Sequence, residues 1–295
     1  MKAAICFSGM PRTFKSTRES HQKYIFDVLK NNNIEYDLFL HTWDNKVNYV
    51  KYFPDEGPPN EIFDYYEFKS HKIETYTHEK MKILVKEAKI HEYENYFRKN
   101  NGHQIESSVQ DGVAKQKDNV LSCFYGWDEV NKLRKDYEIK NNIKYDLVIK
   151  TRFDNLFFDK LNNETLSAEK NTIFSPLGYE GIDKSLYGGV MNDLFLVGDR
   201  DSMDCYMSAF HRISDLLKER LDSKHRAVWH PCGMTKQNLI NNNIELKRFY
   251  LNHVPVRRHH THKNAGGVVT GEGWNILVKP TDEITTENKE WKCKL

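Results

Sequence analysis

The residues best suited to chemistry lie immediately after short apolar segments of the chain. Arg152 and Asp154 follow the segment YDLVIKT, Asp44 follows YDLFLHTW, and Ser8 with Gly9 ends the segment KAAICF. A carboxylate just past a buried strand is well placed to hold a divalent cation against a diphosphate, because such cations prefer oxygen ligands. An aspartate that caps a turn, or a plain ion pair with the arginine, would leave the same pattern. A site is favoured because three such segment ends carry polar residues.

The elements that position these residues follow a strand–helix–strand order at the start of the chain. Residues 2–7 form an apolar run that ends near a glycine and a proline, which predicts a buried strand and a turn. Apolar residues at helical spacing predict a helix up to about residue 30, and residues 36–41 predict a second strand. This order is typical of a parallel βαβ unit, so we expect an α/β fold. In open α/β sheets, ligands bind beyond the carboxyl ends of the strands.

The later elements are predicted from the same patterns of apolar residues. Further strands are expected at 71–76, 145–151, 172–175, 194–197 and 244–248. Helices are expected at 77–101, 107–137, 202–218 and 235–241. From residue 252 onward the sequence is rich in histidine, arginine and glycine and shows no such pattern. We therefore expect one domain at residues 1–251, followed by a C-terminal segment at residues 252–295.

The composition limits the classes of function. Hydrophobic residues make up 39% of the 295 residues and charged residues 29%, which allows a substantial core and argues against wholesale disorder. The formal net charge of +2 argues against general nucleic-acid binding, which needs a concentrated basic face. The five cysteines are scattered and include no C-x-x-C pair, so we expect reduced thiols rather than a disulfide framework or a structural zinc site.

The sequence contains no recognisable signal for secretion or for crossing a membrane. The apolar stretch at the N-terminus is too short for a signal peptide, and no window approaches the roughly 20 apolar residues of a membrane helix. We therefore expect a cytoplasmic protein without a transmembrane segment. If its product is a membrane glycan, the protein would contact the membrane peripherally, at the inner face. The sequence does not indicate the oligomeric state.

Three segments carry a resemblance to a known family: AICFSGMPRTF, YDLFLHTWD and YDLVIKTRFDNLFF, in this order. They resemble bacterial and viral glycosyltransferases of the GT-A type, in particular members of polysaccharide and lipopolysaccharide synthesis. The resemblance implies a single Rossmann-like GT-A domain, with a mostly parallel central sheet flanked by helices, and a nucleotide-sugar donor. For a viral member, the place of action would be the cytoplasm of the host.

The resemblance also implies roles for particular residues. Ser8, Gly9 and Arg12 in the first segment would contact the nucleotide, and Asp44 after the second strand would lie near the base. The later segment NDLFLVGD resembles the acceptor-side strand of the family and contains Asp193. Asp193 would deprotonate the acceptor hydroxyl if the enzyme inverts the configuration of the sugar, whereas a retaining enzyme needs no such base.

The sequence departs from the family at its metal-binding motif. Arg152 and Asp154 form an R-x-D sequence where other members carry D-x-D, so a guanidinium replaces one carboxylate. Asp154, the expected catalytic residue beside Asp193, would stabilise the leaving diphosphate through Mn²⁺ or Mg²⁺. A cation held by this loop would need a further protein ligand. Alternatively, Arg152 neutralises the phosphate charge directly.

The C-terminal segment offers residues for both possibilities. His260 and His262 are candidate metal ligands, because some GT-A enzymes that this segment resembles use a late histidine in that way. Arg257 and Arg258 are candidate contacts to the diphosphate, and Gly266-Gly267 would let the segment close as a lid over the donor site. A solvated basic loop without a ligand role explains the same residues.

The predicted function is the transfer of a sugar from a nucleotide-diphosphate sugar to a glycan, a glycolipid or another hydroxyl acceptor. The nearest alternative enzyme is a phosphosulfate-dependent sulfotransferase, whose phosphate-binding loop the segment FSGMPRT superficially resembles. Phe14 and Lys15 stand where that loop would need hydroxyl side chains. A catalytically inactive glycan- or nucleotide-binding protein on the same fold is a third interpretation, supported by the missing carboxylate. The sequence does not indicate the donor sugar, the base or the acceptor.

Overall fold

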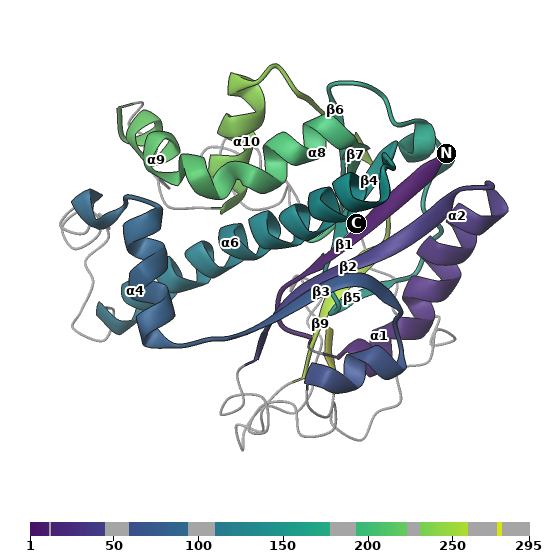
Figure 1. Cartoon of the computed structure of the whole chain (residues 1–295), viewed down its shortest axis with the longest axis horizontal. Helices are drawn as coiled ribbons and strands as arrows, with labels where there is room; N and C mark the ends of the chain where they lie inside the picture. Colours follow the sequence, from purple (N-terminus) through teal and green to yellow (C-terminus); the bar gives the residue numbers. More distant parts are fainter. Residues whose placement is uncertain are drawn as a thin grey trace.

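A central mixed β-sheet organises the chain (Figure 1). The computed structural model describes residues 1–11, 13–44, 59–93, 110–177, 193–222, 231–258 and 276–278, with the backbone alone at 59, 110–117, 119, 254–258 and 276–278. The sheet has seven strands in the order β3-β2-β1-β4-β7-β6-β8. Helices pack on both of its faces, so the fold is an α/β fold of three layers.

Four parallel strands form one half of the sheet: β1 (Lys2–Ser8), β2 (Glu35–Asp44), β3 (Phe68–Thr75) and β4 (Leu147–Thr151). The other half contains β6 (Thr172–Pro176), β7 (Leu196–Asp199) and β8 (Glu245–Phe249). β7 runs antiparallel to both β4 and β6, whereas β8 is parallel to β6. The predicted α/β class and mostly parallel sheet are confirmed. The reversal of β7 is a further feature, which apolar patterns do not reveal because they carry no information on strand direction.

Helices cover both faces of the sheet. On one face lie α1 (Phe14–His21), the π-helical turn η1 (Gln22–Phe26) and α2 (Asp27–Asn31). On the other face lie α4 (His78–Glu87), α6 (Gln110–Asn141), α8 (Arg200–Met207), α9 (Ile213–Asp222) and α10 (Pro231–Asn241). The long helix α6 crosses this face over β1 and β2 (Figure 1). Short 3₁₀ turns occur at η3 (Pro59–Asp64), η4 (His91–Tyr93), η6 (Asn163–Ser167) and η7 (Ser208–Arg212).

Strand β1 shows why the central strands have continuous apolar sequences. Ala3, Ile5 and Phe7 are fully buried in the core that α1 and α2 share. Ala4 and Cys6 are fully buried in the core on the side of α6. Because helices cover both faces, a central strand has no polar face, and the alternation of apolar and polar residues is lost. A charged residue inside such a strand therefore needs a specific partner.

A second sheet of three strands begins directly after Asp154. It contains β5 (Asn155–Phe157), β9 (His253–Arg258) and β10 (Ile276–Val278). β9 pairs antiparallel with β5, so that His253 lies opposite Phe157 and Pro255 lies opposite Asn155. Residues 253–258, where the sequence shows no pattern of apolar residues, thus form a strand. A proline and two arginines interrupt the apolar pattern of this short strand, and its pairing with β5 leaves no local signal.

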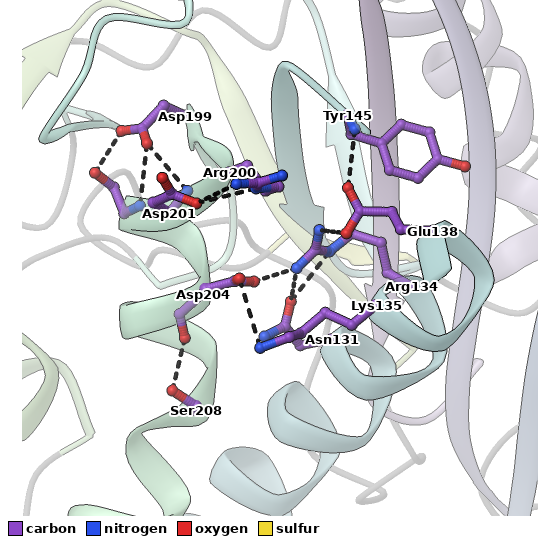
Figure 2. A network of polar contacts seen from close by, with 11 residues as sticks. Asn131, Arg134, Lys135, Glu138, Tyr145, Asp199, Arg200, Asp201, Asp204 and Ser208 are labelled. Atoms are coloured by element: carbon purple, nitrogen blue, oxygen red, sulfur yellow. Dashed lines mark hydrogen bonds and ion pairs between the residues drawn. The ribbon is translucent and has the colours of Figure 1, made fainter. Parts of the chain in front are cut away.

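A buried charge network fastens α6 to α8 (Figure 2). Arg134 on α6 is fully buried and donates to Glu138 Oε2 at 2.6 Å and to Asn131 Oδ1 at 2.8 Å. Arg134 also donates to the carboxylate of Asp204 on α8. Glu138 accepts a hydrogen bond of 2.9 Å from the backbone N–H of Tyr145, just before β4. The network thus pairs its buried charges and joins two helices to the start of the central strand.

The described residues show neither a disulfide nor a membrane-spanning helix. Within that part of the chain, Cys6, Cys123, Cys205 and Cys232 are free thiols. No helix there combines the length and the apolar composition that crossing a bilayer requires. The remaining cysteine, Cys293, lies outside the described residues.

Candidate functional site

The carboxyl ends of β1 and β4 lie side by side at the point where the order of the strands in the sheet reverses. From β1, the strands β2 and β3 extend the sheet on one side, and β4 extends it on the other side. In open α/β sheets such a topological switch point is where ligands bind. Phe7 pairs with Thr151 near the ends of the two strands. The next residues, Ser8 and Arg152, therefore lie at neighbouring strand ends. The structure thus brings the first and third segments predicted from sequence to one edge of the sheet.

Arg152 and Asp154 form a bidentate ion pair at this edge. Nε of Arg152 donates to Asp154 Oδ1 at 2.8 Å, and Nη2 donates to Oδ2 at 2.6 Å. The side chain of Asp154 is 1% exposed, whereas that of Arg152 is 24% exposed. Burial lowers the pKa of Arg152, but attraction to the Asp154 carboxylate outweighs burial and raises this pKa above its ordinary value. Within the pair, the carboxylate is therefore buried, and the permanently charged guanidinium is partly exposed.

Asp193 reaches the same edge and is held there by the segment around β4. The Lys150 ammonium donates to the carbonyl oxygen of Asp193, and Asn155 Nδ2 donates to the carbonyl oxygen of Leu194 at 2.9 Å. Burial lowers the pKa of Lys150, and attraction to Asp154 raises that of Arg152 against its burial; the Asp193 charge favours the charged form of both. The structure thus brings the carboxylate expected on the acceptor side into the electrostatic range of the arginine.

Lys150 is a buried cation inside the apolar strand β4. Lys150 is 1% exposed, and its Nζ lies 4.5 Å from the centroid of the Trp127 ring on α6. Burial lowers the pKa of Lys150 to about 8, although the Asp193 charge acts in the opposite direction. One hydrogen bond to a carbonyl oxygen and one cation–π contact offset only part of the hydration free energy that an ammonium loses on burial. Lys150 therefore fixes the backbone of Asp193 at a cost to stability.

A neutral histidine holds the backbone next to Asp154 from the opposite face of the sheet. His21 on α1 is 1% exposed, with Nε2 at 2.8 Å from the carbonyl oxygen of Asn155 and Nδ1 at 2.9 Å from Tyr66 Oη. Because a carbonyl only accepts, Nε2 carries the hydrogen, and Nδ1 accepts from the tyrosine hydroxyl. Burial lowers the pKa of His21 to about 4. The histidine is therefore uncharged at neutral pH.

We expect His21 to make the protein less stable in acid. The unfolded chain binds a proton at about the ordinary pKa of 6.5, whereas the folded chain binds it only at about pH 4. Stability is thus complete above pH 6.5 and falls as the pH falls towards 4, by about 2 kcal/mol between pH 7 and pH 5. Urea unfolding at these two pH values measures the loss. His21→Phe removes the titrating group, so an equal pH dependence in both proteins would contradict this assignment.

Ser8 lies at the end of β1 but beneath helix α6. A Cβ atom added to Gly126 would stand 2.7 Å from Ser8 Oγ and 3.3 Å from His41 Nδ1, so the helix packs directly on both side chains. Ser8 is only 3% exposed. The next residue, Gly9, has a φ of 115° that favours glycine, and its carbonyl oxygen accepts a bond of 2.8 Å from Thr42 Oγ1. The hydroxyl of Ser8 thus faces the helix, and the turn at Gly9 is the part left for a ligand.

Asp44 ends β2 at the same edge of the sheet. Its Oδ1 is buried and accepts no hydrogen bond from the described part of the chain. A buried carboxylate oxygen without a donor is costly, so a hydroxyl or N–H group of a ligand is a fitting partner. This geometry suits the contact near a nucleotide base that the resemblance implies for Asp44.

A charged network next to Asp44 was not predicted from the sequence. His41 Nε2 lies 2.9 Å from Glu74 Oε2, and Lys80 Nζ lies 3.1 Å from Glu74 Oε1. Burial alone would raise the pKa of Glu74, but hydrogen bonds from His41, Lys80 and Tyr125 lower it well below its usual range. Glu74 is therefore ionised and accepts the hydrogen of His41 Nε2. The available signal was the histidine itself, a polar residue inside an otherwise apolar strand.

Within the described part of the chain, Asp154 is surrounded by a guanidinium rather than by further metal-binding side chains. Both of its carboxylate oxygens accept hydrogen bonds from Arg152. Throughout the described ranges, no group of three or more His, Cys, Asp or Glu side chains is arranged to hold a metal ion. The described side chains around Asp154 therefore do not form a set of ligands for a divalent cation. The two other expected metal ligands, His260 and His262, lie outside the described residues.

The basic residues expected at the diphosphate are only partly covered by the structure. Arg12 lies outside the described residues, and Arg257 and Arg258 lie on β9, where only the backbone is described. The register of β9 with β5 carries residues 256–258 past the end of β5 that adjoins Asp154. The backbone placement is thus compatible with a contact between β9 and the edge of the sheet that Arg152 occupies.

Comparison with family models and with curated proteins does not identify the site. No family model matches this chain, and no curated protein matches it either.

Two positioning residues of this site were missed at the level of sequence, Lys150 and Asn155. The sequence places Lys150 inside a predicted strand, and a lysine in a buried strand needs a hydrogen-bonding or charged partner, which spacing alone does not identify. Asn155 directly follows Asp154 and was not distinguished from the turn. A third unexpected feature is Gly126, a glycine in the middle of α6 that allows close approach to β1 and β2.

Proposed function

We propose that this chain transfers a sugar from a nucleotide-diphosphate sugar to a hydroxyl acceptor. The observation that carries the proposal is the partly exposed Arg152, which the buried Asp154 fixes at the carboxyl end of β4, next to β1. A fixed guanidinium at a topological switch point suits the diphosphate of a nucleotide donor. The segments that resemble GT-A glycosyltransferases supply the ends of β1, β2 and β4, which supports the same proposal.

We also propose that the domain is of the GT-A type and that its acceptor is a glycan or a glycolipid. A parallel half with the order β3-β2-β1-β4 is compatible with a Rossmann-like nucleotide-binding fold. The small sheet with β5 and β9 begins directly after Asp154 and so adjoins the same edge. These features support the proposed type of domain, whereas the proposed acceptor rests on the resemblance of the three segments.

The site residues can serve both steps that sugar transfer requires. Negative charge develops on the leaving diphosphate, and Arg152 is placed to stabilise this charge. The acceptor hydroxyl loses its proton, and Asp193 is the candidate base if the configuration of the sugar is inverted. Lys150 and Asn155 support this role because they fix the backbone at Asp193 and at Leu194.

We expect uridine or guanosine diphosphate to raise the melting temperature of the protein, and adenosine 3′,5′-bisphosphate to leave it unchanged. A ligand that binds only the native state stabilises it by about 2.7 kcal/mol at 100 times its Kd. For a chain of this size the melting temperature should rise by about 4 °C. A thermal-shift series with the three nucleotides measures the effect.

The controls separate this function from its alternatives. Arg152→Gln should lose the shift, whereas Arg200→Gln should keep it, because Arg200 pairs with Asp201 on the exposed surface of α8. A shift with the bisphosphate alone would contradict the proposal in favour of a sulfotransferase. Nucleotide binding without any cleavage of UDP- or GDP-sugars would instead indicate an inactive binding protein.

A further inference from the structure

We propose that Arg152 takes the place of the divalent cation, so that the donor nucleotide binds without a metal ion. The proposal rests on the glycosyltransferase function proposed above. Asp154 is then a positioning residue that orients the guanidinium, rather than a ligand to a metal. The evidence lies in the hydrogen bonds, the burial and the charges around this pair.

The hydrogen bonds of Arg152 leave one side of its guanidinium for a ligand. A guanidinium has five N–H groups. Asp154 accepts from one on Nε and one on Nη2, and no other acceptor for this side chain occurs in the described part of the chain. Three N–H groups remain, among them both of those on Nη1. Phosphate oxygens are bound by guanidinium groups through parallel hydrogen bonds of this kind.

Both oxygens of the Asp154 carboxylate are bound by Arg152. Both of its oxygens accept charge-assisted hydrogen bonds, at 2.8 and 2.6 Å, and its side chain is 1% exposed. A cation at Asp154 would have to displace the guanidinium or stand next to it, and like charges in contact repel each other. Displacement would also leave a partly buried arginine without its partner, which is strongly unfavourable.

Two further charged groups, Lys150 and Asp193, lie near the ion pair of Arg152 and Asp154. Lys150 and Arg152 occupy alternate positions along the chain, so their side chains start from the same face of the strand. The two cations repel each other, so the charge of Arg152 adds to burial in lowering the pKa of Lys150. The Asp193 carboxylate acts on both of them. Two cations therefore stand near the switch point, and only Arg152 is exposed enough to meet a phosphate.

Isothermal titration with uridine and guanosine diphosphate tests the proposal. The nucleotides are titrated into wild-type protein in EDTA, and then into the same protein with Mn²⁺. We expect the Kd of the nucleotide that binds to agree within about threefold between the two conditions. Arg152→Gln should weaken this binding by about 10- to 100-fold in both. Arg200→Gln, the matched change in an exposed pair, should leave the Kd unchanged.

The outcomes distinguish this inference from the function on which it rests. Binding that needs Mn²⁺ and disappears in EDTA would overturn the metal-free proposal and leave the glycosyltransferase function standing. Binding in neither condition would overturn both. The comparison of the two conditions uses the wild-type protein alone, so a folding defect in Arg152→Gln does not affect it. Arg152→Lys, which keeps the charge but not the fork of donors, should bind with an intermediate Kd.

Discussion

Asp154→Asn is expected to lower the rate of donor cleavage by about two orders of magnitude or more at saturating donor. Asparagine has nearly the same shape, but its amide is uncharged and accepts hydrogen bonds at only one oxygen. Arg152 would therefore lose one of its two charge-assisted bonds and its fixed orientation. The rate is measured as the release of nucleoside diphosphate from a UDP- or GDP-sugar.

The matched control for this variant is Asp201→Asn. Arg200 donates to Asp201 from Nε at 3.0 Å and from Nη2 at 2.9 Å, but the side chain of Asp201 is 77% exposed. Donor cleavage by this control should equal that of the wild type. Because Asp154 is buried, its variant should also lose about 3 kcal/mol of stability, so thermal melting must show a folded protein before rates are compared. Wild-type turnover by folded Asp154→Asn would show that this carboxylate only closes a turn.

Arg134→Met is expected to lower the free energy of unfolding by about 3–5 kcal/mol. Arg134 is fully buried between α6 and α8, and its loss would leave the carboxylates of Glu138 and Asp204 without their shared cation (Figure 2). The side chain of Glu138 is 10% exposed, so water can restore little of the lost interaction. Urea unfolding followed by circular dichroism measures the change.

The adjacent lysine provides the control for this network. Lys135 is 50% exposed and lies 3.6 Å from Asp204 Oδ2. Lys135→Met removes the same charge from the same helix, but an exposed ion pair contributes less than about 1 kcal/mol. If Arg134→Met were no more destabilising than Lys135→Met, the network would not be what fastens α6 to α8.

Strands that are buried on both faces were the elements most readily predicted from the sequence. β1, β2 and β4 each form an apolar run that ends in polar residues, because helices cover both sides of the sheet. β5 and β9 were missed because β5 has three residues and Pro255 interrupts the pattern of β9. Their pairing joins residues 155–157 to residues 253–255, and no local pattern contains a contact between such distant segments.

For the site, residue types could be predicted but their partners could not. The change from apolar to polar residues located Arg152 and Asp154, and the alternative of a plain ion pair was left open. Whether this carboxylate meets a cation or a guanidinium depends on side-chain directions after β4, which spacing alone does not determine. The burial of Ser8 under α6 likewise depends on the approach of Gly126, a contact between distant parts of the chain.

The most direct test of the proposed site is a crystal structure of the protein with uridine or guanosine diphosphate, grown without metal ions. We predict that the diphosphate lies at the carboxyl ends of β1 and β4, with an oxygen within about 3 Å of Arg152 Nη1. A pocket of about 740 Å³ lies at the opposite edge of the sheet, where Lys2, Glu35 and Tyr36 line it at the amino ends of β1 and β2. A diphosphate bound in that pocket, away from Arg152, would contradict the assignment of the site.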